Sequence, residues 1–231
     1  MANYKKVEDI FAWIGNADII RNNVKNDDGV DTVTGVDWFS YGGTTCTNVY
    51  ASGNSFLGFG SNSEHLKVNR RDSASYYVYR EEGTLYNYYK FLRIRWSGYS
   101  RYNATSADCK LTYDIVLWDT GDISICMIDI PTSNYDGTFA LGNTSYTAPT
   151  ALSPHVTFTL QGDGSYAVSY SQIELELPYD ARYLIRSGTT LYTVVDGALS
   201  ELATTDILAQ TFLDYGIEDM PDGALLVGLS N

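Results

Sequence analysis

Residues 111–130 carry the sequence LTYDIVLWDTGDISICMIDI, which is typical of a β-hairpin. Apolar side chains alternate along 111–118 and again along 123–130, with the period of two that a strand requires. The turn residues DTGD at 119–122 separate the two halves, and Pro131 ends the second one. Because both faces of the hairpin are largely apolar, we expect it to lie centrally in a sandwich rather than at a sheet edge.

Strand patterns continue on both sides of this hairpin. Upstream, residues 91–96 alternate between an apolar face and a face with two arginines. Downstream, 156–160 and 166–170 alternate around a Gly-Asp-Gly turn, and 173–177 alternate before Pro178. The sequence shows no alternation of strands with helices. It therefore predicts a mainly β fold, an antiparallel β-sandwich of jelly-roll-like type.

One short helix is expected near each end of the chain. The first has an apolar stripe at i, i+3, i+4 and i+7 over residues 7–14, and Gly15 stops it. The second begins at a cap, Thr204 or Thr205, and ends at Gly216. Its apolar residues are Ile207, Leu208, Phe212 and Tyr215.

These patterns divide the chain into three parts. Residues 1–29 are predicted to be an N-terminal helix with a polar linker, and 30–178 to be the β-sandwich domain. Residues 179–231 are predicted to be a small acidic α+β unit, with a hairpin over 183–195 and a final strand over 224–229. Since a unit of this size is marginal alone, we expect it to pack on the sandwich or on another subunit.

Composition excludes several function classes. The 231 residues include 28 acids against 15 bases, for a net charge of −13, which disfavours nucleic-acid binding. The longest apolar runs are far shorter than the roughly 20 residues of a membrane-spanning helix, so no membrane insertion is expected. The first residues are polar and lack the apolar core of a signal peptide, which favours a protein that stays in the cytoplasm where it is made.

The residues that usually bind metals or carry out catalysis are few. Three cysteines without a CxxC motif and two histidines make a zinc site improbable and favour reduced thiols. The acidic run 26–31 is faintly similar to a calcium loop, but Gly35 stands where the loop needs a glutamate, so a solvated linker is predicted. No metal and no cofactor is expected. His65 is expected to face solvent or to serve as a hydrogen-bonding prop.

No catalytic residue is predicted, because the sequence has no GxSxG elbow, Walker A motif or Rossmann glycine pattern. Paired carboxylates can support glycoside hydrolysis. Glu81 and Glu82 are adjacent, so they face opposite ways on a strand, whereas Glu174 and Glu176 share a face about 7 Å apart. The second pair is typical of the solvent side of an amphipathic strand, and a glycan hydrolase remains a less favoured alternative.

A basic and aromatic stretch extends from Lys67 to Arg101, with eight of the fifteen basic residues among seven tyrosines. One interpretation is a grip on a sugar, favoured over nucleic acid by the overall charge. The other is that arginines and tyrosines pair across the outward faces of strands. The candidate glycan-binding residues are Trp96, Tyr99, Arg101 and Tyr102. The alternative places Trp96 in the core and makes the tyrosines ordinary loop residues.

Residues 182–188 (RYLIRSG) and 191–199 (LYTVVDGAL) resemble a recurring unit in tail-appendage proteins of bacteriophages of Gram-positive bacteria, and 212–217 (FLDYGI) look like its continuation. The hairpin around 113–122, together with 58–62 (GFGSN), is similar to a sandwich domain of the same kind of protein. The resemblance implies a structural or receptor-binding role in a virion, in a tail or tail-fibre-like appendage. It also implies a symmetric homo-oligomer, and it brings no catalytic residues.

Together, these observations predict a non-enzymatic virion protein that assembles in the reducing cytoplasm of a host. Other virion or tail proteins are its expected partners, a trimer or hexamer its expected state, and a host surface glycan its candidate receptor. The alternative is a carbohydrate-binding β-sandwich module.

Overall fold

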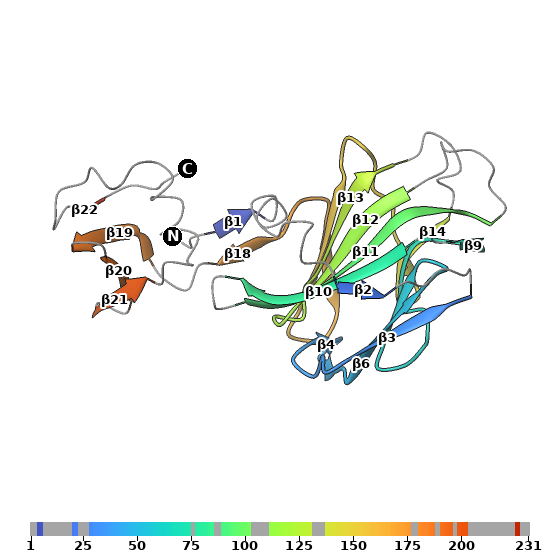
Figure 1. Cartoon of the computed structure of the whole chain (residues 1–231), viewed down its shortest axis with the longest axis horizontal. Coiled ribbons are helices and arrows are strands. Elements are labelled where there is room, and N and C mark those ends of the chain that lie inside the picture. The colour runs from blue at the N-terminus through green and yellow to red at the C-terminus, as the bar shows by residue number, and fades with distance from the viewer. Residues whose placement is uncertain are drawn as a thin grey trace. The chain divides into compact units, whose positions relative to one another are not determined.

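The computed structural model describes residues 4–6, 20–22, 28–74, 77–85, 89–102, 111–130, 137–176, 180–187, 190–195, 198–202 and 225–226. Within these residues the chain is mainly β, its sheets are antiparallel, and no helix is present (Figure 1). The chain divides into two compact units. The larger consists of Ala12–Gly83 and Tyr89–Ile173, and the smaller of Met1–Phe11, Thr84–Tyr88 and Glu174–Asn231.

The larger unit contains an eight-stranded sheet in which strands that follow one another in the chain mostly lie side by side. Its order is β17-β16-β13-β12-β11-β10-β2, with the short β9 paired to β11. The strands are β2 (Ile20–Asn22), β9 (Ser73–Ala74), β10 (Tyr77–Leu85), β11 (Tyr89–Arg101), β12 (Leu111–Trp118), β13 (Ile123–Asp129), β16 (His155–Leu160) and β17 (Tyr166–Ser169).

The predicted central hairpin is confirmed as β12 and β13. Leu117 pairs with Ile123 across the turn. The Gly121 N–H donates to the Trp118 carbonyl, and the Trp118 N–H donates to the Asp122 carbonyl. β12 lies between β11 and β13, and seven of its eight residues are buried. The expectation of a central position, drawn from two apolar faces, is therefore correct.

A six-stranded sheet completes the larger unit, with the order β15-β14-β8-β7-β6-β3. Its strands are β3 (Val30–Thr34), β6 (Asn48–Ser52), β7 (Phe56–Phe59), β8 (Leu66–Arg70), β14 (Thr138–Leu141) and β15 (Thr144–Ser145). The two-residue strands β4 (Ser40–Tyr41) and β5 (Thr44–Thr45) form a separate hairpin in the segment of chain that connects β3 to β6.

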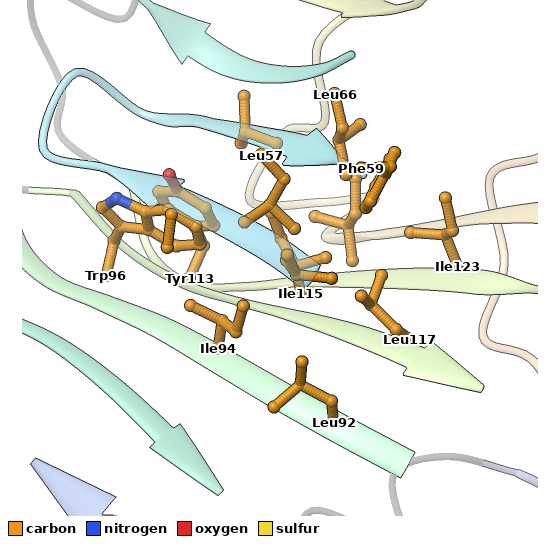
Figure 2. Packing of buried hydrophobic residues seen from close by; sticks show 14 of the residues in the cluster. Leu57, Phe59, Leu66, Leu92, Ile94, Trp96, Tyr113, Ile115, Leu117 and Ile123 are labelled. Atoms are coloured by element: carbon orange, nitrogen blue, oxygen red, sulfur yellow. The ribbon is translucent and has the colours of Figure 1, made fainter. Parts of the chain in front are cut away.

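One hydrophobic cluster joins the two sheets (Figure 2). Leu57, Phe59 and Leu66 of the six-stranded sheet face apolar residues of β11, β12 and β13. Full burial of each such side chain contributes about 1.5–3 kcal/mol. The period-two patterns therefore form a single core rather than separate ones.

The expected jelly-roll-like arrangement is not seen in the order of the described strands of the larger unit. A Greek key, the unit of a jelly roll, returns a strand beside the first of a series. Both large sheets instead keep sequential order, from β2 to β17 and from β3 to β15. The period of two identifies strands, but strand order depends on the connections, which apolar patterning does not encode.

The smaller unit contains a four-stranded sheet, β21-β20-β19-β22, and a two-stranded one in which β1 (Tyr4–Lys6) pairs with β18 (Glu174–Glu176). Its remaining strands are β19 (Asp180–Ser187), β20 (Thr190–Val195), β21 (Ala198–Leu202) and β22 (Leu225–Leu226). The hairpin expected over 183–195 and the turn into 198 are confirmed by the pairing of β19, β20 and β21.

Both predicted helices, over 7–14 and 205–215, lie outside the described residues. The polar linker predicted within residues 1–29 was expected to begin at Asn22, but Asn22 lies in β2 and pairs with Val78 of β10. The three-part division into 1–29, 30–178 and 179–231 stays a prediction.

Candidate functional site

Trp96 cannot be part of a glycan-binding platform, because its side chain is fully buried, with 0% of its surface exposed. Its ring stacks on Tyr113, and its Nε1 donates a hydrogen bond to the Ser52 carbonyl at 2.9 Å. Trp96 shares the core face of β11 with Leu92 and Ile94. The alternative interpretation of Trp96 as a core residue is therefore the correct one.

The other three candidate glycan-binding residues gather at the end of β11. The register shifts between Trp96 and Tyr99, and beyond this irregularity Arg101 pairs with Ser73 of β9. The side chains of Tyr99 and Arg101 lie outside what the structure describes. Tyr102 follows directly and is 49% exposed, so a ring surface is available there.

Arg93 and Arg95, from the basic and aromatic stretch, lie in a charge network on the face of β11 opposite the core. The Arg93 guanidinium lies 2.7 Å from a Glu81 carboxylate oxygen and 3.7 Å from one of Asp114. Arg95 binds both oxygens of Asp114, with nitrogen–oxygen distances of 2.6 and 2.8 Å.

Burial explains why this charge network is paired. Arg93 is only 1% exposed, and an unpaired charge at such a depth would cost several kcal/mol. The hydrogen bond to Asp114 raises the pKa of the Arg95 guanidinium, so the pair stays ionised. These two arginines bind carboxylates, and Arg93 is buried rather than on an outward face, so the expected pairing of arginines with tyrosines stays a prediction.

A tyrosine pair lies on β10 beside this charge network. The Tyr77 and Tyr79 ring centroids are 5.7 Å apart with planes tilted by 36°, and Tyr77 is 38% exposed. Alternation along the strand places both tyrosines on the same face as Glu81. Partly exposed aromatic rings next to charged hydrogen-bonding groups are suited to a sugar, whose apolar face stacks and whose hydroxyls bind polar atoms.

Tyr77 and Tyr79 belong to the basic and aromatic stretch from Lys67 to Arg101, but they were not among the candidate glycan-binding residues predicted from the sequence. The signal was their spacing of two along a strand, which puts both rings on one face. We call Tyr77 and Tyr79 the tyrosine pair.

A second group of side chains, the turn cluster, connects several turns of the larger unit. It consists of Tyr41, Phe59, His65 and Tyr166. The Tyr166 hydroxyl accepts a hydrogen bond from the Gly42 N–H and donates one to the Gly121 carbonyl, both at 3.2 Å. Burial raises the pKa of Tyr166 to about 12, so it remains a neutral donor at physiological pH.

His65 serves as a hydrogen-bonding prop within the turn cluster, as one of the two expectations for it stated. Its Nδ1 accepts the Phe59 N–H at 3.0 Å, which requires an unprotonated nitrogen. Burial lowers the pKa of His65 and favours this neutral form. The contact holds the loop between β7 and β8 closed.

Of the two candidate carboxylate pairs, the structure describes the side chains of only one. Glu81 is buried in the charge network while Glu82 is exposed, so the adjacent pair does face opposite ways. Glu174 and Glu176 stand opposite Lys6 and Tyr4 in the β1–β18 pairing, and their side chains lie outside the described residues.

The acidic run 26–31 and the cysteines are described only in part, and their described residues contact other protein groups. Asp28 accepts a hydrogen bond from the Asn54 side chain at 3.3 Å. Burial raises the pKa of the Cys46 thiol, which keeps it protonated, and Cys109 lies outside the described residues. Among the described residues, no group of three His, Cys, Asp or Glu side chains is arranged to hold a metal ion.

Comparison with known proteins finds no matching family model, no matching curated protein and no matching solved structure. In the part of the chain that is described, no helix is both long and apolar enough to span a bilayer.

Proposed function

We propose that this chain is a non-enzymatic structural protein of a virion, a tail or appendage component that self-assembles and takes part in host recognition. The observation that carries the proposal is the sheet of β19, β20 and β21. Its strands contain the described residues of the stretch 182–199, which resembles the phage tail-appendage unit. The three strands form consecutive antiparallel hairpins.

The architecture of the larger unit supports the same role. Two antiparallel sheets around one aromatic-rich core are compatible with a β-sandwich, which presents loops and edges on a rigid support. The ionic groups that are described in its interior are engaged with one another. Other virion proteins are its proposed partners, and the virion is its proposed location.

The test is the molar mass of the full chain, measured by size-exclusion chromatography with light scattering at two protein concentrations. We expect a trimer or hexamer whose mass does not change with concentration, because virion appendages are closed symmetric assemblies. A monomer at both concentrations would contradict the proposal. Negative-stain electron microscopy of the same sample should show particles with the matching rotational symmetry.

The tyrosine pair favours a second candidate function, carbohydrate binding. A glycan array probed with the full chain should give hits that Tyr77→Ala removes and Tyr77→Phe retains, because stacking needs the ring and not the hydroxyl. Tyr102→Ala tests the exposed ring at the end of β11 in the same way. An array without hits would eliminate this candidate and leave the structural role unaffected.

A turnover assay on labelled cell-wall polysaccharide distinguishes a glycan hydrolase from a structural protein and from a carbohydrate-binding one. We expect no turnover. Product formation that Glu174→Gln or Glu176→Gln abolishes would instead identify the chain as a hydrolase.

A further inference from the structure

We propose that β17 is an interface between two copies of this chain, whose β17 strands pair antiparallel about a twofold axis. The inference does not rest on a virion role, because it follows from the position, exposure and sequence of one strand.

β17 ends the order of the eight-stranded sheet, with β16 on one side. Ala167, Val168 and Ser169 are exposed, and Val168 has 37% of its surface open. Tyr170 directly after the strand is 42% exposed. Among the described strands none pairs with the other edge of β17, and three of its four residues are exposed.

The backbone groups at this open edge can be assigned from the pairing with β16. The Gln161 N–H donates to the Ser165 carbonyl at 2.9 Å, so these two residues form a hydrogen-bonded pair. In an antiparallel ladder such pairs alternate, which makes Ala167 and Ser169 the next residues bonded to β16. The N–H and C=O groups of Tyr166, Val168 and Tyr170 consequently point away from β16.

The β17 edge has no charge to prevent association. Residues 165–171 (SYAVSYS) contain neither a charged residue nor a proline. Proteins usually block an exposed edge with such residues. The other edge strands of three or more described residues each contain a charged residue: β1 has Lys5, β2 has Arg21, β3 has Asp31, β18 has Glu174 and β21 has Glu201.

Charge also argues for a second copy as the occupant. With a net charge of −13, two copies repel each other at most surfaces, and a neutral strand is where they can meet. Pairing centred on Val168 places Tyr166 opposite Tyr170 of the second copy and Ala167 opposite Ser169. The first pair is aromatic and the second joins two small side chains, and neither includes like charges.

Further apolar surface lies next to the strand. The Tyr170 hydroxyl donates to the Thr147 carbonyl at 3.0 Å, which connects the strand to the segment that leads into β16. In that segment Leu152 is almost fully exposed. An exposed leucine in the segment that contacts Tyr170 is apolar area that a second copy could bury.

The twofold symmetry of the proposed contact limits which oligomers the chain can form. A twofold contact is self-complementary and builds dimers, or a hexamer with three such contacts, but it cannot build a plain trimer. A dimer supports this inference and contradicts the trimer or hexamer of the proposed function. A trimer overturns this inference and leaves the proposed function intact, and a hexamer is consistent with both.

The experiment compares Val168→Lys with Thr32→Lys, a matched control on the exposed edge strand β3. Light scattering of the full chain should show that Val168→Lys halves the mass, because two lysines would face each other across the axis. Thr32→Lys should keep the wild-type mass. An unchanged mass for Val168→Lys, or equal effects of both variants, overturns the inference.

Amide hydrogen exchange on the wild type gives a second readout that does not depend on how a variant folds. The Val168 and Tyr170 amides should exchange more slowly in the associated form than in a sample diluted until the chains separate, while the amides of β3 keep the same rate. Equally fast exchange of the Val168 amide in both samples overturns the inference. If the complex is too tight to be separated by dilution, the Val168 amide should exchange as slowly as the amides of the central strand β12. Fast exchange of the Val168 amide in that complex would also overturn the inference.

Discussion

The indole of Trp96 lies nearly parallel to the ring of Tyr113, with centroids 5.1 Å apart and planes 8° apart. The two residues pair across β11 and β12, and each is also bound to the other sheet. The Trp96 Nε1 donates to the Ser52 carbonyl, and the Tyr113 hydroxyl shares a hydrogen bond with the Ser55 hydroxyl. Since Ser52 and Ser55 flank the turn between β6 and β7, the stacked pair connects the eight-stranded and six-stranded sheets.

Trp96→Ala should therefore lower the free energy of unfolding by about 3–5 kcal/mol, the usual cost of removing a buried aromatic side chain. Tyr113→Phe keeps the stacked ring but leaves the Ser55 hydroxyl without this partner, and it should cost about 1–2 kcal/mol. Urea unfolding followed by circular dichroism measures both. If the two variants lose equal stability, stacking adds nothing to the hydrogen bond.

The charge network predicts a large difference between two glutamates. Glu81→Gln removes a carboxylate from buried Arg93 and should cost about 3 kcal/mol, because an incompletely compensated charge remains in the interior. Glu64→Gln removes the partner of Arg70 in a half-exposed pair and should cost less than about 1 kcal/mol. Thermal and urea unfolding of both variants test this order, and similar losses would refute a buried role for Glu81.

His65 predicts a stability change in mildly acidic solution. Burial lowers its pKa in the folded state, so below about pH 6.5 the unfolded chain binds more protons. The contribution of His65 is therefore complete above that pH and is lost as the pH falls through the folded pKa. His65→Asn keeps an acceptor for the Phe59 N–H but does not titrate, so its urea midpoint should fall less between pH 7 and pH 5. Parallel curves for variant and wild type would contradict this assignment.

Two glycines of one turn should respond differently to alanine. At Gly164 the backbone has φ of +83°, and an added Cβ would lie 2.8 Å from the Gly42 carbonyl oxygen. Gly164→Ala should cost about 1–3 kcal/mol, through backbone strain and separation of the two turns. Gly162 has no atom within 4 Å of an added Cβ, so Gly162→Ala should change stability by less than about 0.5 kcal/mol. Thermal unfolding of the two variants tests this contrast, which would fail if both had the same midpoint.

Alternation of apolar residues predicted the strands well because it reflects a local physical requirement. The hairpin of 111–130, its central position and the hairpins of 156–170 and 183–195 all follow from side chains that face a core every second residue. Strand order does not follow from it. β8 pairs with β14, which is 68 positions later in the chain at Arg70 and Thr138, and no local pattern encodes that pairing.

The candidate site was harder to predict because aromatic and charged residues serve both surfaces and interiors. Trp96 and Tyr99 are three residues apart, yet the register irregularity between them separates a core strand face from the strand end. Arg93 has the sequence signature of a binding arginine. Only the positions of Glu81 and Asp114 on neighbouring strands reveal that it is engaged in the interior.

The sequential strand orders have a consequence for how this chain can be divided. Between β2 and β16 the polypeptide passes from one large sheet to the other four times, at β2–β3, β8–β9, β13–β14 and β15–β16. The six-stranded sheet needs β14 and β15, which follow most strands of the eight-stranded sheet in the chain, and the eight-stranded sheet needs β16 and β17, which follow the whole six-stranded sheet. Fragments cut within residues 30–170 should consequently remain unfolded, and limited proteolysis should degrade this region in an all-or-none manner rather than release a stable half.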